Sequence, residues 1–141
     1  LKQIPLQRIA YNAIPSVVYT NPEIACIGLT EKDLNEIHEG DFAPSMSTDE
    51  PFVPYEVHKL PMTFSGRFVA ENEGEMGLCK VIVDKRNKTL IGVHMIGNPC
   101  SEFVAAASFA VRMGYTVAEF KQVVFPHPTV GEVLREVIME A

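Results

Sequence analysis

The sequence of 141 residues lacks the common motifs of nucleotide-binding and hydrolytic enzymes. No strand-like run is followed by GxGxxG, the fingerprint of a dinucleotide-binding turn, and there is no GxxxxGK[ST] phosphate loop. The zinc-protease motif HExxH and the serine-hydrolase motif GxSxG are absent as well. The chain therefore does not contain the parts of a complete enzyme of any of these classes.

Cysteine is scarce, and its spacing excludes two kinds of site. Cys26, Cys79 and Cys100 lie far apart and form no CxxC pair. An odd number of widely spaced thiols gives neither a disulfide framework nor zinc-ligand spacing. We expect no metal site and three unpaired thiols that pack as small hydrophobic residues. Unpaired thiols are compatible with a reducing compartment, so we expect a cytoplasmic protein.

Positive charge and long apolar runs are also in short supply. The chain has 12 Lys and Arg against 18 Asp and Glu, a net charge of −6. An acidic chain is poorly suited to nucleic acid or to an anionic membrane surface, and we expect neither as a partner. No apolar run approaches the roughly 20 residues that span a bilayer. The first residues do not resemble a signal peptide, and the start at Leu1 suggests a piece of a longer protein.

Hydrophobic residues make up 47% of the chain and charged residues 21%. This composition and length predict one folded domain over residues 1–141, with residues 1–14 as an N-terminal connecting segment. For the first half we expect two short strands over residues 16–20 and 24–29, and then a helix over 30–40 that Thr30 caps. A loop over 41–54, a strand over 55–62 and a polar connection over 64–76 with one helical turn should follow.

The second half begins with the clearest hairpin, residues 77–97 around DKRNKT. A helix should follow, with Asn98 as its N-cap, Pro99 at its first position and Gly114 at its end. A short helix over 116–124 and a last helix that begins at Thr129 complete the chain. Strands joined by tight turns, with helices grouped after them, predict an α+β fold: an antiparallel sheet of about five strands with helices packed on it.

One segment near the end of the chain, VVFPHPTVGEVLRE, carries a candidate catalytic group. His127 stands between two prolines, and Glu132 follows five residues later. Imidazole titrates near neutral pH, and flanking prolines restrict the backbone that carries it. A histidine before proline is most often only a loop residue, and Glu132 is also explained by a capping box that starts at Thr129. For His38, His58 and His94, which have no acid or thiol partner at ligand spacing, we expect surface or strand-packing roles.

Three stretches together resemble the C-terminal interface domain of the pyridine nucleotide–disulfide oxidoreductases. They read IPSVVYTNPEIACIGLTEKDL, LIGVHMIG and HPTVGEVLRE, and the resemblance covers residues 12–141 in the family's order. It implies an FAD domain and an NAD domain that this chain does not contain, and a two-fold homodimer formed through the interface domain. It also implies that FAD and NAD bind only to the full-length enzyme, and that this chain alone binds neither and is inactive.

The same resemblance implies roles for single residues. One subunit of this family lends a histidine to the redox-active cysteine pair of the other, which by motif makes His127 the base and Glu132 its carboxylate partner. A dithiol must lose a proton to react, so the assignment suits the chemistry. The His127–Pro128 bond is implied to be cis, with its backbone near the partner subunit's flavin. The family often has a second histidine two residues before the base, where this chain has Phe125.

Within the family the chain is most similar to the dihydrolipoyl dehydrogenases, which oxidise dihydrolipoamide, or a dihydrolipoyl-carrying protein, with NAD. Relatives that act on glutathione or mercuric ion share HPTxxE, so a glutathione or mercuric reductase-like parent is an alternative. The ending EVLREVIMEA and the lack of a C-terminal cysteine pair favour the first reading. A stand-alone dimerisation module is the other alternative, although a pure scaffold has no use for a base. The apolar stretch FVAAASFAVRMG is expected to pack on the core, with part of its face at a dimer contact.

Overall fold

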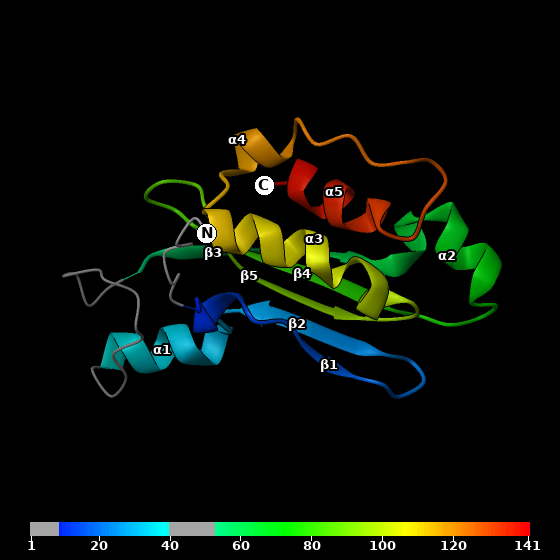
Figure 1. Cartoon of the computed structure of the whole chain (residues 1–141), viewed down its shortest axis with the longest axis horizontal. Helices are drawn as coiled ribbons and strands as arrows, with labels where there is room; N and C mark the ends of the chain where they lie inside the picture. The colour runs from blue at the N-terminus through cyan, green and yellow to red at the C-terminus, as the bar shows by residue number, and fades with distance from the viewer. Residues whose placement is uncertain (1–8, 40–52) are drawn as a thin grey trace, which may run out of the picture.

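The computed structural model describes residues 9–39 and 53–141, apart from the side chains of residues 38 and 39. Five strands form one antiparallel sheet in the order β1-β2-β5-β4-β3 (Figure 1). Their bounds are Ser16–Val18 for β1, Ile24–Gly28 for β2, Tyr55–Pro61 for β3, Leu78–Asp84 for β4 and Leu90–Ile96 for β5. The α+β fold and the number of strands predicted from the sequence are confirmed.

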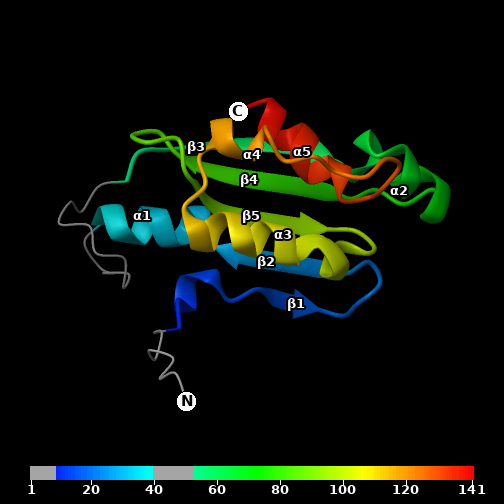
Figure 2. The same ribbon diagram turned by 45° about the horizontal axis from the view of Figure 1, so that its top comes forward.

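The helices lie on both faces of the sheet. They are α1 (Glu31–Glu39), α2 (Gly66–Glu71), α3 (Cys100–Met113), α4 (Val117–Phe120) and α5 (Glu132–Met139). Helix α3 packs over β2 and β5, and α5 packs over β3 and β4. Helix α1 lies against the opposite face, at one end of the sheet (Figure 2). Single 3₁₀ turns at Tyr11–Ala13 and Met62–Phe64 precede β1 and α2.

Two apolar clusters follow from the alternation of side chains along the strands. Cys79, Val81 and Val83 of β4 point toward α3 and α5 and belong to the larger cluster. Ile82, between them, points the other way and packs with Leu34 and the rest of the smaller cluster beneath α1. All four residues of β4 named here are fully buried. The sheet is therefore the middle layer of the domain, and the larger core lies on the α3 and α5 side.

The predicted start of α1 is confirmed, and the predicted start of α3 is wrong. Thr30 caps α1 as expected: its hydroxyl accepts the Asp33 N–H at 3.1 Å, and the Asp33 carboxylate accepts the Thr30 N–H at 2.8 Å. Helix α3, however, starts at Cys100 and takes Pro99 rather than Asn98 as its N-cap. The Asn98 side chain instead accepts the N–H of Glu23 at 2.9 Å and donates to the Asn21 side chain. It joins two turns and is not available to the helix.

Two further boundaries differ from the prediction. Helix α4 ends at Phe120 instead of running to residue 124, and α5 begins at Glu132 rather than Thr129. Gly114 does end α3, in the left-handed conformation with φ 63°. The expected loop over 41–54 lies almost wholly outside the described residues. The shorter α4 and α5 leave a longer connection between them, and this connection carries the candidate catalytic histidine.

Candidate functional site

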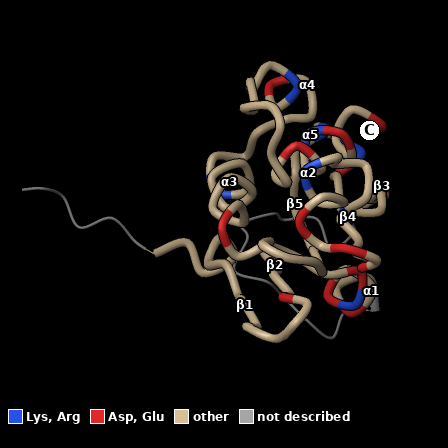
Figure 3. The backbone as a smooth tube through the Cα atoms, turned by 90° about the vertical axis from the view of Figure 1, so that its right-hand side faces the viewer, with Lys and Arg blue, Asp and Glu red and all other residues tan. Residues whose placement is uncertain are grey.

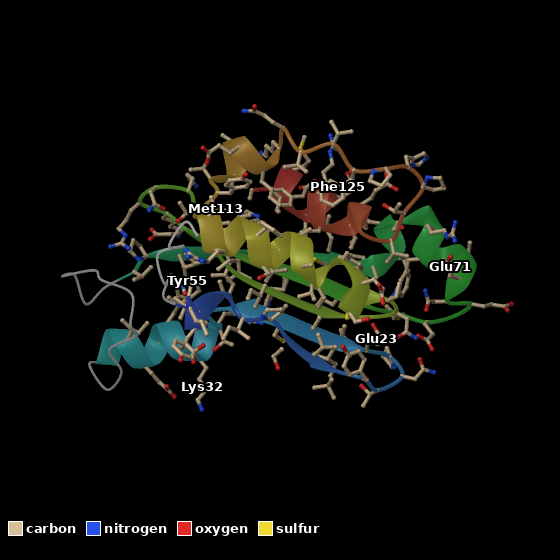
Figure 4. All side chains as sticks on the ribbon, viewed as in Figure 1. Glu23, Lys32, Tyr55, Glu71, Met113 and Phe125 are labelled. Carbon is tan, nitrogen blue, oxygen red and sulfur yellow. The ribbon has the colours of Figure 1, made fainter. Side chains whose placement is uncertain are left out.

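The connection from residue 123 to residue 131, called here the His-Pro segment, crosses the outer side of the α3 and α5 layer (Figure 1). Phe125, labelled in Figure 4, lies near its start, and its ring centroid is 5.9 Å from that of Phe120 in α4. Val130, near its end, is only 5% exposed. Pro126, His127 and Pro128 between these two anchors are exposed. The segment is thus held at both ends and projects the histidine outward.

His127 and Glu132 form the pair that the sequence predicted. The His127 Nδ1 atom lies 2.9 Å from Glu132 Oε1, and the imidazole is 81% exposed. An ionised carboxylate can only accept a hydrogen bond, so this contact assigns the ring hydrogen to Nδ1. The Nε2 lone pair is then left free to accept a proton from outside the domain. The His127–Pro128 peptide bond is cis, as expected.

Glu132 uses both of its carboxylate oxygens. While Oε1 meets the imidazole, Oε2 accepts the backbone N–H of Thr129 at 2.8 Å. The hydrogen bond from the Thr129 N–H has the largest effect and lowers the pKa of Glu132. The hydrogen bond and the charge interaction with His127 lower it further. A carboxylate with a lowered pKa is ionised at neutral pH. The site therefore presents a fixed negative charge behind an exposed imidazole.

The predicted capping box is only half formed. Glu132 accepts the Thr129 N–H, but the Thr129 hydroxyl donates to the Pro126 carbonyl at 2.8 Å instead of capping the helix. Gly131 takes the N-cap position of α5 with no side-chain hydrogen bond. The reason is that the hydroxyl closes the turn around His127 and so is not available to the helix. Glu132 accordingly acts on the turn and on the imidazole together.

Sequence reasoning missed one residue of this site. Ser65, directly before α2, is 3% exposed and donates from its hydroxyl to the Thr129 carbonyl at 2.9 Å. It also accepts the N–H of Phe68 at 3.2 Å and so caps α2. A serine before a helical turn is an N-cap signal in the sequence. Its second partner, 64 residues away, leaves no such local signal.

A groove of about 420 Å³ runs along the inner side of the His-Pro segment. Its walls are mainly apolar and include Phe103 of α3 with Phe125 and Pro128 of the segment. Arg67 and Glu71 of α2, which form an ion pair with each other, line its rim. The groove therefore lies where the His-Pro segment, α2 and α3 come together.

The other histidines lie elsewhere. His94 Nε2 is 3.0 Å from the Leu29 carbonyl oxygen, and burial lowers the pKa of its ring. His58 does have an acidic neighbour, contrary to expectation, since its Nε2 lies 3.7 Å from Glu56 on the same strand. Residues two apart on a strand share a face, which explains the contact. The His38 side chain falls outside the described residues.

The cysteines are all free, and their surroundings make them poor nucleophiles. Burial raises the pKa of Cys79 to about 12 and that of Cys100 to about 11. Burial also raises the pKa of Cys26, which is half-buried on β2. A thiol with a raised pKa is protonated at neutral pH and does not attack disulfides. These residues therefore pack in and around the core, as the sequence predicted, and do not act as nucleophiles.

Over residues 9–39 and 53–141, no group of three or more His, Cys, Asp and Glu side chains is placed to hold a metal ion. In the same part of the chain, no helix is both long enough and apolar enough to cross a membrane.

Comparison with known proteins gives a family match over most of the chain. Residues 14–138 match the family model described as "Pyridine nucleotide-disulphide oxidoreductase, dimerisation domain". A mitochondrial dihydrolipoyl dehydrogenase of Caenorhabditis elegans is 36% identical over 133 residues, which are 94% of this chain and 24% of that protein. A dihydrolipoyl dehydrogenase of Thermus scotoductus is 36% identical over 123 residues, 87% of this chain and 23% of its own length. The chain thus spans about a quarter of the length of the curated relatives it matches.

Solved structures show the same fold at lower sequence identity. LpdA of Mycobacterium tuberculosis superposes with a TM-score of 0.77 at 21% identity, covering 96% of this chain and 26% of that one. The flavoprotein disulfide reductase RclA of Escherichia coli, described as HOCl-induced, superposes with a TM-score of 0.72 at 19% identity. The match covers 89% of this chain and 26% of the RclA chain. In each case the similar part is again about a quarter of a longer protein.

Proposed function

This chain belongs to the pyridine nucleotide-disulphide oxidoreductase dimerisation domains, and on that premise we propose that it is the interface domain of an FAD-dependent dihydrolipoyl dehydrogenase. The curated relatives with that name are about four times as long as the matched part. We propose that residues 1–141 are this one domain, with residues 1–14 as its connection. The rest of the parent polypeptide would hold FAD and NAD, and these groups would supply the redox chemistry that takes an electron pair from the dithiol.

The proposed role of His127 is to take the proton of a substrate or protein thiol in the partner subunit. A thiolate, not a thiol, is the nucleophile in dithiol chemistry, so a base at this point speeds the reaction. The geometry suits the role because Glu132 holds Nδ1 and leaves Nε2 pointing outward on an 81% exposed ring. Once the proton arrives, the ring is positively charged, and the adjacent carboxylate stabilises that charge.

The fixed carboxylate behind an exposed imidazole is the observation on which this proposal rests. A domain that served only association would gain nothing from a carboxylate fixed behind an imidazole on a projecting segment. A glutathione or mercuric reductase-like parent would use the same pair. The C. elegans and T. scotoductus relatives are both dihydrolipoyl dehydrogenases, which favours dihydrolipoamide, free or on a carrier protein, as substrate. We also propose that the backbone of His127 and Pro128 lies near the partner subunit's flavin.

A homodimer is part of the proposal, because the matched family model describes a dimerisation domain and the proposed role of His127 is in the partner subunit. Exposed apolar side chains on the outer side of the helical layer are candidates for the contact. Phe109 and Met113, one turn apart on α3, are 72% and 62% exposed, and Val124 in the His-Pro segment is 91% exposed. Most of the tube of α3 is uncharged (Figure 3). Exposed apolar surface of this kind marks an interaction site, and we assign it to a second copy of the chain.

The experiment that tests the base is the substitution His127→Gln in the parent enzyme. Flavin reduction by dihydrolipoamide, followed anaerobically by stopped-flow absorbance, should slow by about 10²–10⁴-fold, as is usual for a lost general base. Flavin reduction by NADH needs no thiol deprotonation and should keep its rate. The same substitution at His58, on β3, is the matched control and should leave both rates unchanged. An unchanged dithiol rate in His127→Gln would reject the proposal.

The cellular location belongs to the proposal as well. We expect the parent enzyme in the cytoplasm or another reducing compartment, because all three cysteines of the chain are free. Cell fractionation with an antibody against the chain tests this expectation.

A further inference from the structure

A buried hydroxyl from a distant part of the chain holds the segment that carries the candidate base. Ser65 is 3% exposed, and its Oγ donates to the carbonyl of Thr129 at 2.9 Å. The same oxygen accepts the N–H of Phe68, whose side chain is fully buried in the larger core. Ser65 therefore connects α2, which is anchored in the core by Phe68, with the end of the His-Pro segment.

Thr129 is the point at which the hydrogen bonds of the site meet. Its carbonyl accepts from Ser65, and its N–H donates to Glu132 Oε2 at 2.8 Å. Its hydroxyl donates to the carbonyl of Pro126 at 2.8 Å. The second oxygen of Glu132 then meets His127. A shift of the Thr129 backbone would displace the carboxylate and with it the ring.

We propose that Ser65 is a positioning residue for His127. Its hydroxyl holds the Thr129 peptide, this peptide orients Glu132, and Glu132 holds the imidazole with the hydrogen on Nδ1 and the lone pair of Nε2 outward. The effect passes through hydrogen bonds and not through charge, because Ser65 is neutral and does not touch the reacting atoms. The proposal rests on the proposed function of His127 as a base.

The competing explanation is that Ser65 only caps α2, since a lost N-cap by itself destabilises a helix. Asn72 at the other end of α2 allows the two roles to be separated. Its side-chain amide donates to the carbonyls of Phe68 and Asn98, both at 3.1 Å. Asn72→Ala therefore weakens α2 without removing the contact with Thr129, and it is the matched control for Ser65→Ala.

The first test is kinetic and uses the parent enzyme. Flavin reduction by dihydrolipoamide should be about three- to tenfold slower in Ser65→Ala, the effect of one neutral hydrogen bond. Flavin reduction by NADH should be unchanged, and Asn72→Ala should keep both rates. A wild-type dithiol rate in folded Ser65→Ala would overturn the proposal. Equal slowing by Asn72→Ala would overturn it too, because weakening of α2 would then be the cause.

The second test is spectroscopic and does not depend on catalysis. Nitrogen NMR of the isotope-labelled histidines in the 141-residue chain reports which ring nitrogen of His127 carries the hydrogen. We expect the Nδ1–H form in the wild type and in Asn72→Ala, and a mixture of both tautomers in Ser65→Ala. An unchanged tautomer in folded Ser65→Ala would overturn the positioning role even if His127 proves to be the base. If His127→Gln leaves the dithiol rate unchanged, the base role fails and the tautomer result still tests Ser65.

A second variant covers the case in which Ser65→Ala does not fold. Ser65→Cys nearly keeps the volume of the side chain, while its thiol is only a weak hydrogen-bond donor. It should show the same loss of dithiol-driven rate and the same mixture of tautomers. A folded Ser65→Cys with wild-type values of both would overturn the proposal.

Discussion

Replacing Glu132 by glutamine removes one charge and, because of the geometry, also forces a choice between two partners. The carboxylate accepts from the Thr129 N–H through Oε2 and from His127 Nδ1 through Oε1, at 2.8 and 2.9 Å. Glutamine has one oxygen and one NH₂ group in their place. If the oxygen stays with Thr129, the NH₂ group faces the imidazole, and Nδ1 must lose its hydrogen to accept from it. The hydrogen then moves to Nε2, the nitrogen that should be the base.

The expected effect on chemistry is therefore close to that of losing the base. Dithiol-driven flavin reduction in Glu132→Gln of the parent enzyme should fall by about 10²–10⁴-fold. A residue that only began the helix would give a much smaller effect, because glutamine also serves in a capping box. The difference between these two expectations is large enough for stopped-flow kinetics to decide.

The effect on stability should be modest and dependent on pH. A hydrogen bond to a charged group contributes about 1.5–3 kcal/mol and a neutral one about 0.5–1.5 kcal/mol, so the loss is about 1 kcal/mol. In a chain of this length, that lowers the melting temperature by about 3–5 °C. The pKa of Glu132 is lowered in the folded chain. Its contribution is thus complete above the ordinary glutamate pKa of about 4.3 and is lost as the pH falls through the folded value.

The assay pairs two measurements on the same variants. Flavin reduction by dihydrolipoamide and by NADH is measured in the parent enzyme, and thermal melting of the 141-residue chain is followed by circular dichroism at pH 7 and below pH 4. Glu140→Gln, at the end of α5, is the control for loss of one negative charge. A Glu132→Gln enzyme with a normal dithiol rate would refute the reasoning. A difference in melting temperature that grows as the pH falls would refute the assigned sign.

Other predictions follow from the core, the exposed helix face and the missing domains. Leu134→Ala should cost the chain about 2–5 kcal/mol of stability, measured by urea unfolding, because Leu134 is fully buried; Met139→Ala, 44% exposed on the same helix, should cost far less. Phe109→Asp should weaken self-association in sedimentation velocity, whereas Tyr19→Asp, at a similar exposure of 79%, should not. The purified 141-residue chain should show no flavin absorbance and no diaphorase activity, so a stoichiometric flavin spectrum would contradict the proposed absence of the FAD domain.

The strands were predictable because local patterns decide them. Alternating or β-branched runs bounded by turn residues gave all five strands, with bounds within one or two residues. The end of α3 at Gly114 was equally clear, because glycine favours the left-handed conformation found there. The start of α3 was not, because the Asn98 side chain binds Glu23, 75 residues away, instead of the helix. A capping signal fails where a distant partner competes for the same side chain.

In the candidate site, too, the sequence predicted the local pair and missed the distant contact. His127 and Glu132 lie five residues apart, and the motif that contains both could be read directly. The half-formed capping box could not, since only the structure shows that the Thr129 hydroxyl closes the turn at Pro126. Ser65 was out of reach for a different reason. Its contact with Thr129 depends on how α2 and the His-Pro segment come together after the sheet has formed, and no local pattern reports that.

Helix α5 has a consequence for the synthesis of the protein. Its first residue is Glu132, and four of the residues that follow, Val133, Leu134, Val137 and Ile138, are completely buried against the sheet. A ribosome adds this helix after the five strands of the described sheet. A nascent chain that stops before it leaves the face of β3 and β4 open to solvent and also lacks the carboxylate that holds the imidazole. The same eight-residue helix thus supplies a buried layer of the core and the carboxylate of the site, so a chain without it loses both together.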